Sequence, residues 1–479
     1  MALWKYDDLT LEDILLHCMP EDVWEGRPTD QLSVTCAELF YPKRPILPTD
    51  TERLLFHAPL VNKLIVGLPA DGRNLREWEP GLSKEVYEAI GSVLPQPVFV
   101  NLCHLIWYTG GASLSHFQQY LSPSLSSLEL ILTRTARPHI SLLSDLADRC
   151  PFVTSFNLDT ESYNVEDNDK VKVLQSRLIR AWDLHSLESD VLDHSSLIFL
   201  SQSSHLTQLI TSPAYTLRWI PLSLPHKAFA SLCYLHLGNI DMRLCLELFQ
   251  ASTFTAMGRL SLCLLNPAPG DWKRLYAAIQ AAHAQPHLLC SLNIEEWDCN
   301  SEDPNIEGDP VTDDHIMPLL DFTGMRKLSM RTFAGFDLIP ATIERMATAW
   351  PAVEMLSLRS TFTPYWQPRR LTLYALVPLA MQCPNLCYLE LEMDGTDVSI
   401  DQIPPHPNTL SPLSKLSVLW SPIHDSHAVA SFLSIYFPQL ATIHFNATGI
   451  PCEHWRHVRK LVMEFSNIGD HENMEAVDD

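Results

Sequence analysis

A short apolar phrase of the form L-x-x-L-x-L recurs about fourteen times between Pro59 and Phe445, at a mean spacing of about 28 residues. Clear copies begin at Leu125, Leu232, Val353 and Leu386. Side chains alternate between the two faces of a strand, so each phrase predicts a short strand. Its leucine-type positions point inward and the residues between them point outward.

Helical segments that end at a proline separate these phrases. The proline follows each of four such segments, which are 142–150, 341–350, 376–383 and 429–437. Proline cannot continue a helix, and it moves the preceding residue away from helical angles. The cycle of helix, proline and strand predicts an α/β leucine-rich-repeat solenoid. We expect a curved horseshoe with parallel strands on the concave face and helices on the convex face.

The repeat pattern also sets the expected domain boundaries. We predict an N-terminal cap over residues 1–58, a solenoid of about fourteen irregular repeats over residues 59–447, and a C-terminal cap with an acidic disordered tail over residues 448–479. The asparagine that usually follows the strand in such repeats is mostly missing. We therefore expect an irregular solenoid.

Composition narrows the class of partner. The net charge is −24, which repels phosphate backbones and disfavours nucleic acid. No apolar run is long enough to cross a bilayer, and the N-terminus lacks a basic segment followed by an apolar one. The twelve cysteines contain no C-x-x-C pair, which favours free thiols in a reducing compartment. We expect a cytoplasmic or nuclear protein with no membrane partner.

Two patterns resemble metal sites. Residues from Asp303 to Asp314 place oxygen ligands at alternate positions around Gly308, as in a calcium loop, but the terminal ligand is aspartate and no helix pair flanks it. The alternative, which we prefer, is a solvated acidic loop. His424 with His427, and His454 with His457, lack a cysteine or carboxylate partner at zinc-ligand spacing. We expect no metal and no cofactor.

Catalytic motifs are missing from the sequence. It contains no G-x-S-x-G, P-loop or G-x-G-x-x-G pattern. A hydrolase within residues 270–315 is the least supported hypothesis, because no nucleophile motif accompanies it. We therefore expect a binding protein rather than an enzyme.

The outward strand residues are the candidate partner site, because solenoids usually dock partners on the concave face. Tyrosine, tryptophan and arginine are the types enriched in interface hot spots. Arg331 and Arg359 occupy the same place in adjacent repeats and predict a small basic spot. The predicted partner-binding residues are Trp107, Tyr234, His236, Lys327, Arg331, Met355, Arg359, Tyr388, Glu390 and Glu392.

Several phrases resemble the F-box and leucine-rich-repeat proteins of mushroom-forming fungi. They match in order over most of the chain and lie at 16–24, 120–128, 147–155, 346–356 and 420–425. In that family an N-terminal F-box holds a Skp-type adaptor of a cullin ubiquitin ligase, and the repeats select the substrate. The resemblance implies a substrate receptor that binds a protein on its concave face.

The resemblance fails at the N-terminus. The F-box of the family precedes a Leu-Trp pair, which stands here at Leu3 and Trp4. Residues 19–23 and 32–36 imitate parts of an F-box, but Gly26 and Pro28 would break the helix between them. We expect the F-box itself to be missing, so a Skp-type adaptor would bind only if an F-box is encoded upstream. The alternative is a ligase-independent scaffold or a truncated, functionally degraded paralogue.

Overall fold

The computed structural model describes residues 10–28, 38–67, 81–109, 114–132, 140–160, 168–190, 192–211, 224–225, 227–265, 267, 270–297, 309–361, 370–399, 411–446 and 451–475. The chain divides into two compact units, Met1–Thr216 and Leu217–Asp479. The predicted boundaries, with one solenoid over residues 59–447, stay a prediction.

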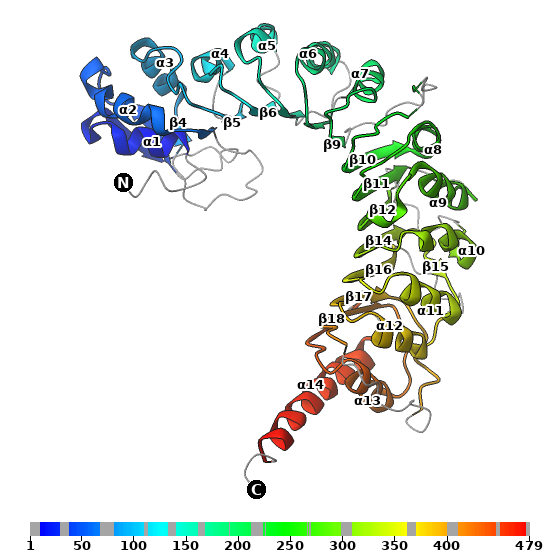
Figure 1. The fold of residues 1–479 in the computed structure, drawn as a ribbon. Helices are drawn as coiled ribbons and strands as arrows, with labels where there is room; N and C mark the ends of the chain where they lie inside the picture. Colours follow the sequence, from blue (N-terminus) through cyan, green and yellow to red (C-terminus); the bar gives the residue numbers. More distant parts are fainter. Residues whose placement is uncertain are drawn as a thin grey trace. The chain divides into compact units, whose positions relative to one another are not determined.

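The first unit contains six parallel strands, and Figure 1 shows its helices gathered along one side of the sheet. The strands, in spatial order, are β3 (Lys63–Val66), β5 (His104–Tyr108), β6 (Ser127–Leu132), β7 (Ser155–Thr160), β8 (Ser186–Ser189) and β9 (Gln208–Thr211). The helices are α1 (Leu11–Cys18), α2 (Glu52–His57), α3 (Lys84–Val93), α4 (Leu114–Phe117), α5 (Leu146–Arg149), α6 (Asn168–Ala181) and α7 (His194–Leu200). A small separate sheet joins β1 (Trp24–Pro28), β2 (Glu38–Pro42) and β4 (Gly81–Leu82).

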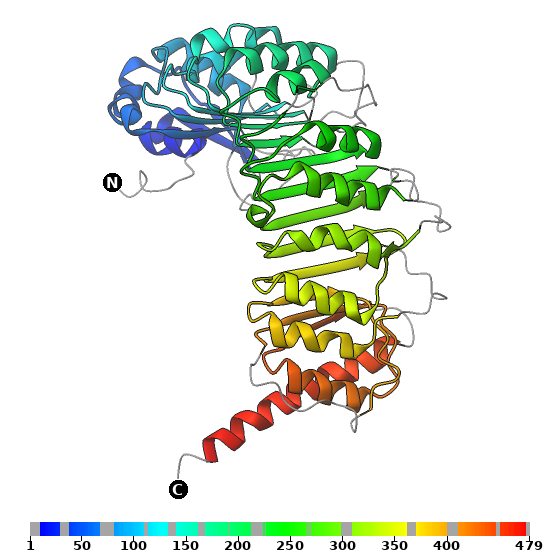
Figure 2. The ribbon, with the colours of Figure 1, turned by 45° about the vertical axis from the view of Figure 1, so that its right-hand side comes forward.

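The second unit repeats the design with eight parallel strands, again with helices along one side (Figure 2). The strands are β10 (Tyr234–Asp241), β11 (Arg259–Leu265), β12 (Ser291–Trp297), β14 (Lys327–Thr332), β16 (Met355–Ser360), β17 (Tyr388–Leu391), β18 (Lys415–Leu419) and β19 (Thr442–Phe445). The helices are α8 (Met242–Ala251), α9 (Asp271–Ala282), α10 (Asp313–Ile316), α11 (Pro340–Ala349), α12 (Val377–Gln382), α13 (Ser426–Tyr436) and α14 (Pro451–Glu475). A two-stranded parallel sheet pairs β13 (Val311–Thr312) with β15 (Phe336–Asp337).

The apolar phrases form the core of each unit. In the repeat of β16, Val353, Leu356 and Leu358 are all at most 1% exposed. Leu356 lies in register with Leu328 on β14 and with Leu389 on β17, so the same inward position is apolar in three consecutive strands. The strands are parallel and helices pack on one side, as expected of a leucine-rich-repeat solenoid. The predicted fold class is confirmed.

The proline stops act as the sequence predicts. At the ends of α5, α11, α12 and α13, the residues that precede the proline are Cys150, Trp350, Cys383 and Phe437, respectively. Each has ψ between 60° and 77°, well away from the helical value. Each also donates its N–H to the carbonyl four residues back, which closes the last turn, and its side chain is buried. The proline therefore ends the helix while the preceding residue enters the core.

A ladder of side-chain donors joins consecutive repeats. The residue just before a strand donates a hydroxyl or thiol hydrogen bond to the carbonyl of the equivalent residue in the preceding repeat. Examples are Ser126 to Cys103 (3.2 Å), Cys387 to Glu354 (3.2 Å) and Ser414 to Cys387 (3.2 Å). We refer to this set as the pre-strand ladder. It provides side-chain bonds between repeats that the sequence pattern did not reveal.

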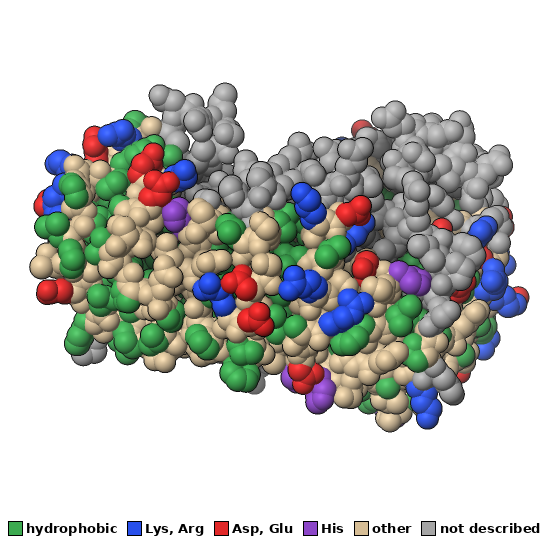
Figure 3. All heavy atoms as spheres, turned by 90° about the horizontal axis from the view of Figure 1, so that it is seen from above, with side chains coloured by type: hydrophobic (Ala, Val, Ile, Leu, Met, Phe, Trp, Pro, Cys, Tyr) green, Lys and Arg blue, Asp and Glu red, His purple; other side chains and the backbone are tan. Residues whose placement is uncertain are grey.

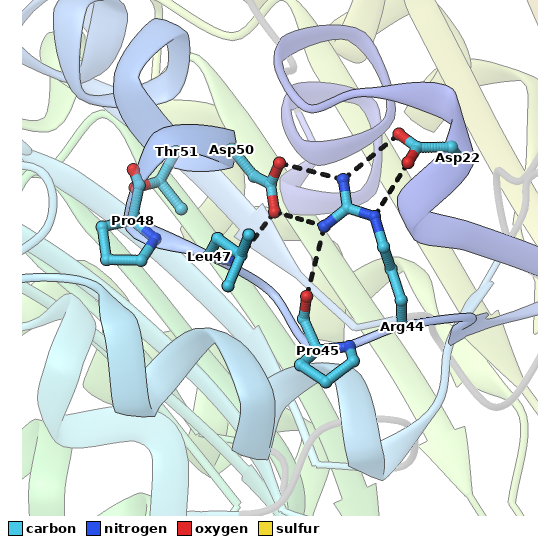
Figure 4. A network of polar contacts seen from close by, with 7 residues as sticks. All are labelled: Asp22, Arg44, Pro45, Leu47, Pro48, Asp50 and Thr51. Carbon is cyan, nitrogen blue, oxygen red and sulfur yellow. Dashed lines mark hydrogen bonds and ion pairs between the residues drawn. The ribbon is translucent and has the colours of Figure 1, made fainter.

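The N-terminal region is held together by Arg44. Its guanidinium donates to Asp22 at 2.8 Å from Nε, to Asp50 at 2.7 Å from Nη1 and to the Pro45 carbonyl (Figure 4). Hydrogen bonds from Arg44, and one from the Leu47 N–H, lower the pKa of Asp50 to about 2. The proline-rich part of the predicted cap is thus ordered around one arginine.

Three predictions concern the two ends of the chain, and their outcomes differ. Gly26 and Pro28 lie in a strand, β1, in agreement with the expected break of helix there. Residues 466–475, which we predicted as part of a disordered acidic tail, continue helix α14. The Leu3–Trp4 pair and residues 32–36 lie outside the described residues.

Candidate partner-binding faces

Along each strand, outward and inward residues alternate. One outward residue comes before the first inward residue, one lies between the two inward residues, and one comes after the second. Because the strands are in register, these positions form three rows across each sheet. On β14 the inward residues are Leu328 and Met330, and the outward ones are Lys327, Ser329 and Arg331. We call the rows first, middle and third, and we call the outward rows of one unit its face.

The face of the second unit is rich in cations. Its first row contains three of them and its third row two. They are Arg259, Lys327 and Lys415 in the first row, and Arg331 and Arg359 in the third. Three carboxylates, Glu295, Glu390 and Glu392, share the rows or lie next to them. Of these cations the prediction contained Lys327, Arg331 and Arg359. It missed Arg259 and Lys415. Each directly precedes the first inward leucine of its strand, Leu260 or Leu416, so the same alternation would have identified both as outward.

Arg331 and Arg359 lie side by side, as predicted. They are register partners on β14 and β16. The Arg331 Nε donates to the Thr361 hydroxyl at 3.1 Å, which fixes the direction of its guanidinium. Within the described part of the chain, neither arginine forms an ion pair with a carboxylate. The pair therefore concentrates positive charge on an otherwise acidic protein.

Two of the three carboxylates of this face accept hydrogen bonds from serine hydroxyls. Glu390 is only 7% exposed, and it accepts hydrogen bonds from Ser357 at 2.5 Å and from Ser417 at 3.1 Å. Glu392 accepts from Ser360 at 2.7 Å. These bonds join carboxylates to hydroxyls rather than to the neighbouring arginines. Glu390 thus lies on the predicted face but offers almost no surface to a partner.

The remaining predicted residues of the second unit are half-buried on the same face. Tyr234, Met355 and Tyr388 belong to the first row, and His236 begins the middle row. Burial raises the pKa of Tyr388, and the charge of Glu390 adds to this. Burial lowers the pKa of His236, so its neutral form is favoured. These side chains add aromatic and apolar surface between the cations.

The placement of Trp107 on the outward face was wrong. Trp107 is 0% exposed and packs against Phe117, with ring centroids 5.2 Å apart, and against Tyr120 at 5.5 Å. It is in register with the inward residues Val66 and Leu130. The phrase from Leu102 has a tryptophan at its third apolar position, where the prediction assumed an outward residue.

The face of the first unit is acidic, a feature the prediction did not contain. Glu129, Asn157 and Glu188 are consecutive register partners in its middle row. Asp159 and Asp190 occupy the third-row position on β7 and directly after β8. A lysine, Lys63, lies in the first row of the same face, on β3.

The crowding of these carboxylates changes their ionisation. Burial raises the pKa of Glu129, and the charges of Glu188 and Asp159 raise it further. Burial and then Asp159 raise the pKa of Glu188. Burial raises the pKa of Asp190 to about 6. The two hydrogen bonds that Thr160 donates to this carboxylate lower the pKa, but by less than burial raises it. Negative charge on this face therefore costs folding free energy.

Among the described residues, no group of three or more histidine, cysteine or acidic side chains could hold a metal ion. Of the calcium-like loop, Asp303 to Gly308 lie outside the described residues. Asp313 accepts hydrogen bonds from the Ile339 N–H and the Thr342 hydroxyl and lies 3.6 Å from Arg370, so it joins α10 to later segments. The ten described cysteines are free thiols.

The side of the molecule seen in Figure 3 shows no separation of charge among its described residues. Over the described part of the side seen in Figure 3, hydrophobic, basic and acidic side chains are interspersed. No helix in the described part of the chain is long and apolar enough to cross a membrane.

Comparison with known proteins gives likenesses among solved structures. No family model matches the sequence, and no curated protein matches it. Among solved structures, the crystal structure of the Rad7 and Elc1 complex in yeast is similar at 11% identity and a TM-score of 0.37. The match covers 72% of this chain and 89% of that chain.

Proposed function

We propose that this chain is a protein-recognition solenoid and that the face of its second unit binds the partner. The observation that carries the proposal is the pair formed by Arg331 and Arg359, which lie in register without a carboxylate partner among the described residues. Like charges placed side by side on neighbouring strands destabilise a sheet. Such a pair fits a binding face better than a purely structural one.

The composition of the same face supports the proposal. Tyr234, Met355 and Tyr388 supply half-buried apolar surface, and Arg359 is exposed. Interface hot spots are enriched in tyrosine and arginine, and interfaces as a whole in methionine.

Photo-crosslinking from two methionines of the second unit tests this function. A photoreactive phenylalanine analogue replaces Met355, in the first row of the face, or Met381, which is 54% exposed on helix α12. In an extract of the source cells, we expect discrete protein adducts from position 355 and not from position 381. Equal adduct patterns from both positions would refute the proposed face. Adducts from position 381 alone would move the site to the helices.

We further propose that this recognition serves a cullin-type ubiquitin ligase. Support comes from the phrases resembling the F-box and leucine-rich-repeat family, which include residues 346–356 and 420–425. Immunoprecipitation of the protein expressed from its own gene should recover a Skp-type adaptor together with the adduct partner. Recovery of the partner without any adaptor would instead establish a ligase-independent scaffold.

A further inference from the structure

We infer that the partner of the second unit presents an extended acidic polypeptide segment, which crosses the strands of the sheet along the middle row. This inference rests on the proposed function and specifies the chemistry of the partner. It follows from the arrangement of the three rows, from the hydrogen bonds that two of the carboxylates accept from serines, and from the spacing of the cations.

The rows differ in side-chain size as well as charge. The middle row from β11 to β16 consists of Ser261, Asn293, Ser329 and Ser357. Long cationic side chains stand on both sides of it, in the first and third rows. A segment lying over the small residues would have Lys327 on one side and the two arginines on the other.

Two of the three carboxylates on this face are held by hydroxyl donors, and the third, Glu295, lies in register with Arg331 and accepts from the Asn293 amide at 3.4 Å. Ser357 and Ser417 donate to the two oxygens of Glu390, and Ser360 donates to one oxygen of Glu392. Within the described residues, no ion pair forms at Arg259, Lys327, Arg331, Arg359 or Lys415. A partner with carboxylates would supply the missing counter-charges. Arginine forks bind carboxylates with two parallel hydrogen bonds.

The spacing sets the length of the segment. The cations extend from Arg259 on β11 to Lys415 on β18, which is five strand intervals. At about 4.8 Å per interval this distance is about 24 Å, and an extended chain at about 3.3 Å per residue covers it with about seven residues. The inference therefore specifies a short linear segment.

A protein segment fits better than a nucleic acid. The net charge of −24 repels a polyanion at long range, and Glu295 and Glu392 interrupt the cations at short range. A peptide can place neutral or apolar side chains opposite these glutamates and opposite Tyr388 and Met355. A nucleic-acid strand has a phosphate at every step.

A display library of random ten-residue peptides tests the inference on the full chain. Peptides are selected on the unmodified protein and counter-selected on R331Q/R359Q. We expect enrichment of aspartate and glutamate, and at least a ten-fold weaker affinity of the selected peptide for R331Q/R359Q by fluorescence anisotropy. R456Q/K460Q, which removes two cations from helix α14, is the matched control and should stay within two-fold of the unmodified protein.

Selection without acidic enrichment, or equal affinity for R331Q/R359Q, would overturn the inference. Tighter binding of an eight-nucleotide oligothymidylate than of the selected peptide would assign the face to nucleic acid instead. The crosslinking result keeps the two proposals distinct. If the peptides fail while position 355 still forms adducts, the face binds a protein by other chemistry. If position 355 forms none, the proposed function itself fails.

Discussion

The two units build the same strand and helix repeat but place opposite charges on their outward rows. In the first unit, four carboxylates lie close together in the middle and third rows: Glu129, Asp159, Glu188 and Asp190. A lysine, Lys63, occupies the first row of the same face. In the second, five cations share the face with three carboxylates, and serine hydroxyls hold two of these carboxylates. The repeat fixes the inward residues and leaves the outward ones free to vary.

This contrast distinguishes the residues that hold the fold from those that remain for recognition. A charge that folding does not require, and that its neighbours disfavour, is a candidate for contact with a partner. Both faces meet this description, with opposite sign. The following variants test the contrast, beginning with the largest expected effect.

The distinction between inward and outward residues is tested most severely by Trp107→Ala in the first unit. The side chain is fully buried against Phe117 and Tyr120, so its removal leaves a large cavity. We expect a loss of about 3–5 kcal/mol in the free energy of unfolding, measured with urea. Tyr108→Ala, at the next and outward position of β5, is the control and should cost much less. Equal losses from the two variants would contradict the assignment of Trp107 as inward and Tyr108 as outward.

On the second face, Glu390→Ala tests whether the hydroxyl bonds satisfy the carboxylate. Ser357 and Ser417 would lose their acceptor, and we expect a loss of about 2 kcal/mol of stability in denaturant unfolding. The triple variant S357A/E390A/S417A removes the stranded hydroxyls and should be no less stable than E390A. A triple variant well below E390A would show that the serines stabilise the sheet by another contact.

The pH dependence of stability should differ in sign between two carboxyls of the first unit. The folded pKa of Asp190 is about 6, above its ordinary value of 3.8. The folded state therefore binds the proton more tightly, and stability falls as pH rises from about 4 to about 6. The penalty at pH 7 is about 2 kcal/mol after allowance for partial exposure. Asp190→Asn should flatten this slope in unfolding curves recorded against pH.

Asp50 provides the opposite case and the control. Its folded pKa of about 2 lies below the ordinary value of 3.8, because Arg44 donates to the charged form. The stabilisation is fully present above about pH 4 and is lost as pH falls toward 2. Asp50→Asn should change the acid limb and leave the slope between pH 4 and 6 intact. Identical profiles for both variants would contradict the assignment.

The smallest expected effect is a gain from Asn157→Lys. Asn157 lies in register between Glu129 and Glu188, so an ammonium there would relieve their repulsion. We expect stabilisation of about 0.5 kcal/mol at pH 7, which added salt should reduce. Ser329→Lys introduces the same side chain between Lys327 and Arg331 and should destabilise the second unit. A gain at both positions would mean that charge does not distinguish the faces.

The fold was predictable because its signal is repeated. Each apolar phrase is weak by itself, but Leu328, Leu356 and Leu389 recur at the same phase, and proline ends the helix before several strands. A strand has only two sides, so the phase also assigned the orientation of Lys327 and Arg359 correctly. It failed at Trp107, where an aromatic residue fills a position that the pattern reserves for leucine.

The site was only partly predictable because partners across strands are not adjacent in sequence. Nothing local to Glu390 indicates that Ser357 and Ser417 hold it, since these residues are 33 and 27 positions away. The acidic row of the first unit was missed for the same reason. Its members look like ordinary surface residues until the strand register brings Glu129 near Glu188.

The pre-strand ladder makes the junctions at Cys387 chemically addressable. Cys387 donates its thiol hydrogen to the backbone carbonyl of Glu354, and Ser414 donates to the carbonyl of Cys387, so one thiol residue takes part in two successive junctions. The Cys387 side chain is exposed, and a thiol-directed reagent can reach it without unfolding the chain. Since repeats interact only with their neighbours, a label at this position would report on the opening of that junction and leave distant ones silent.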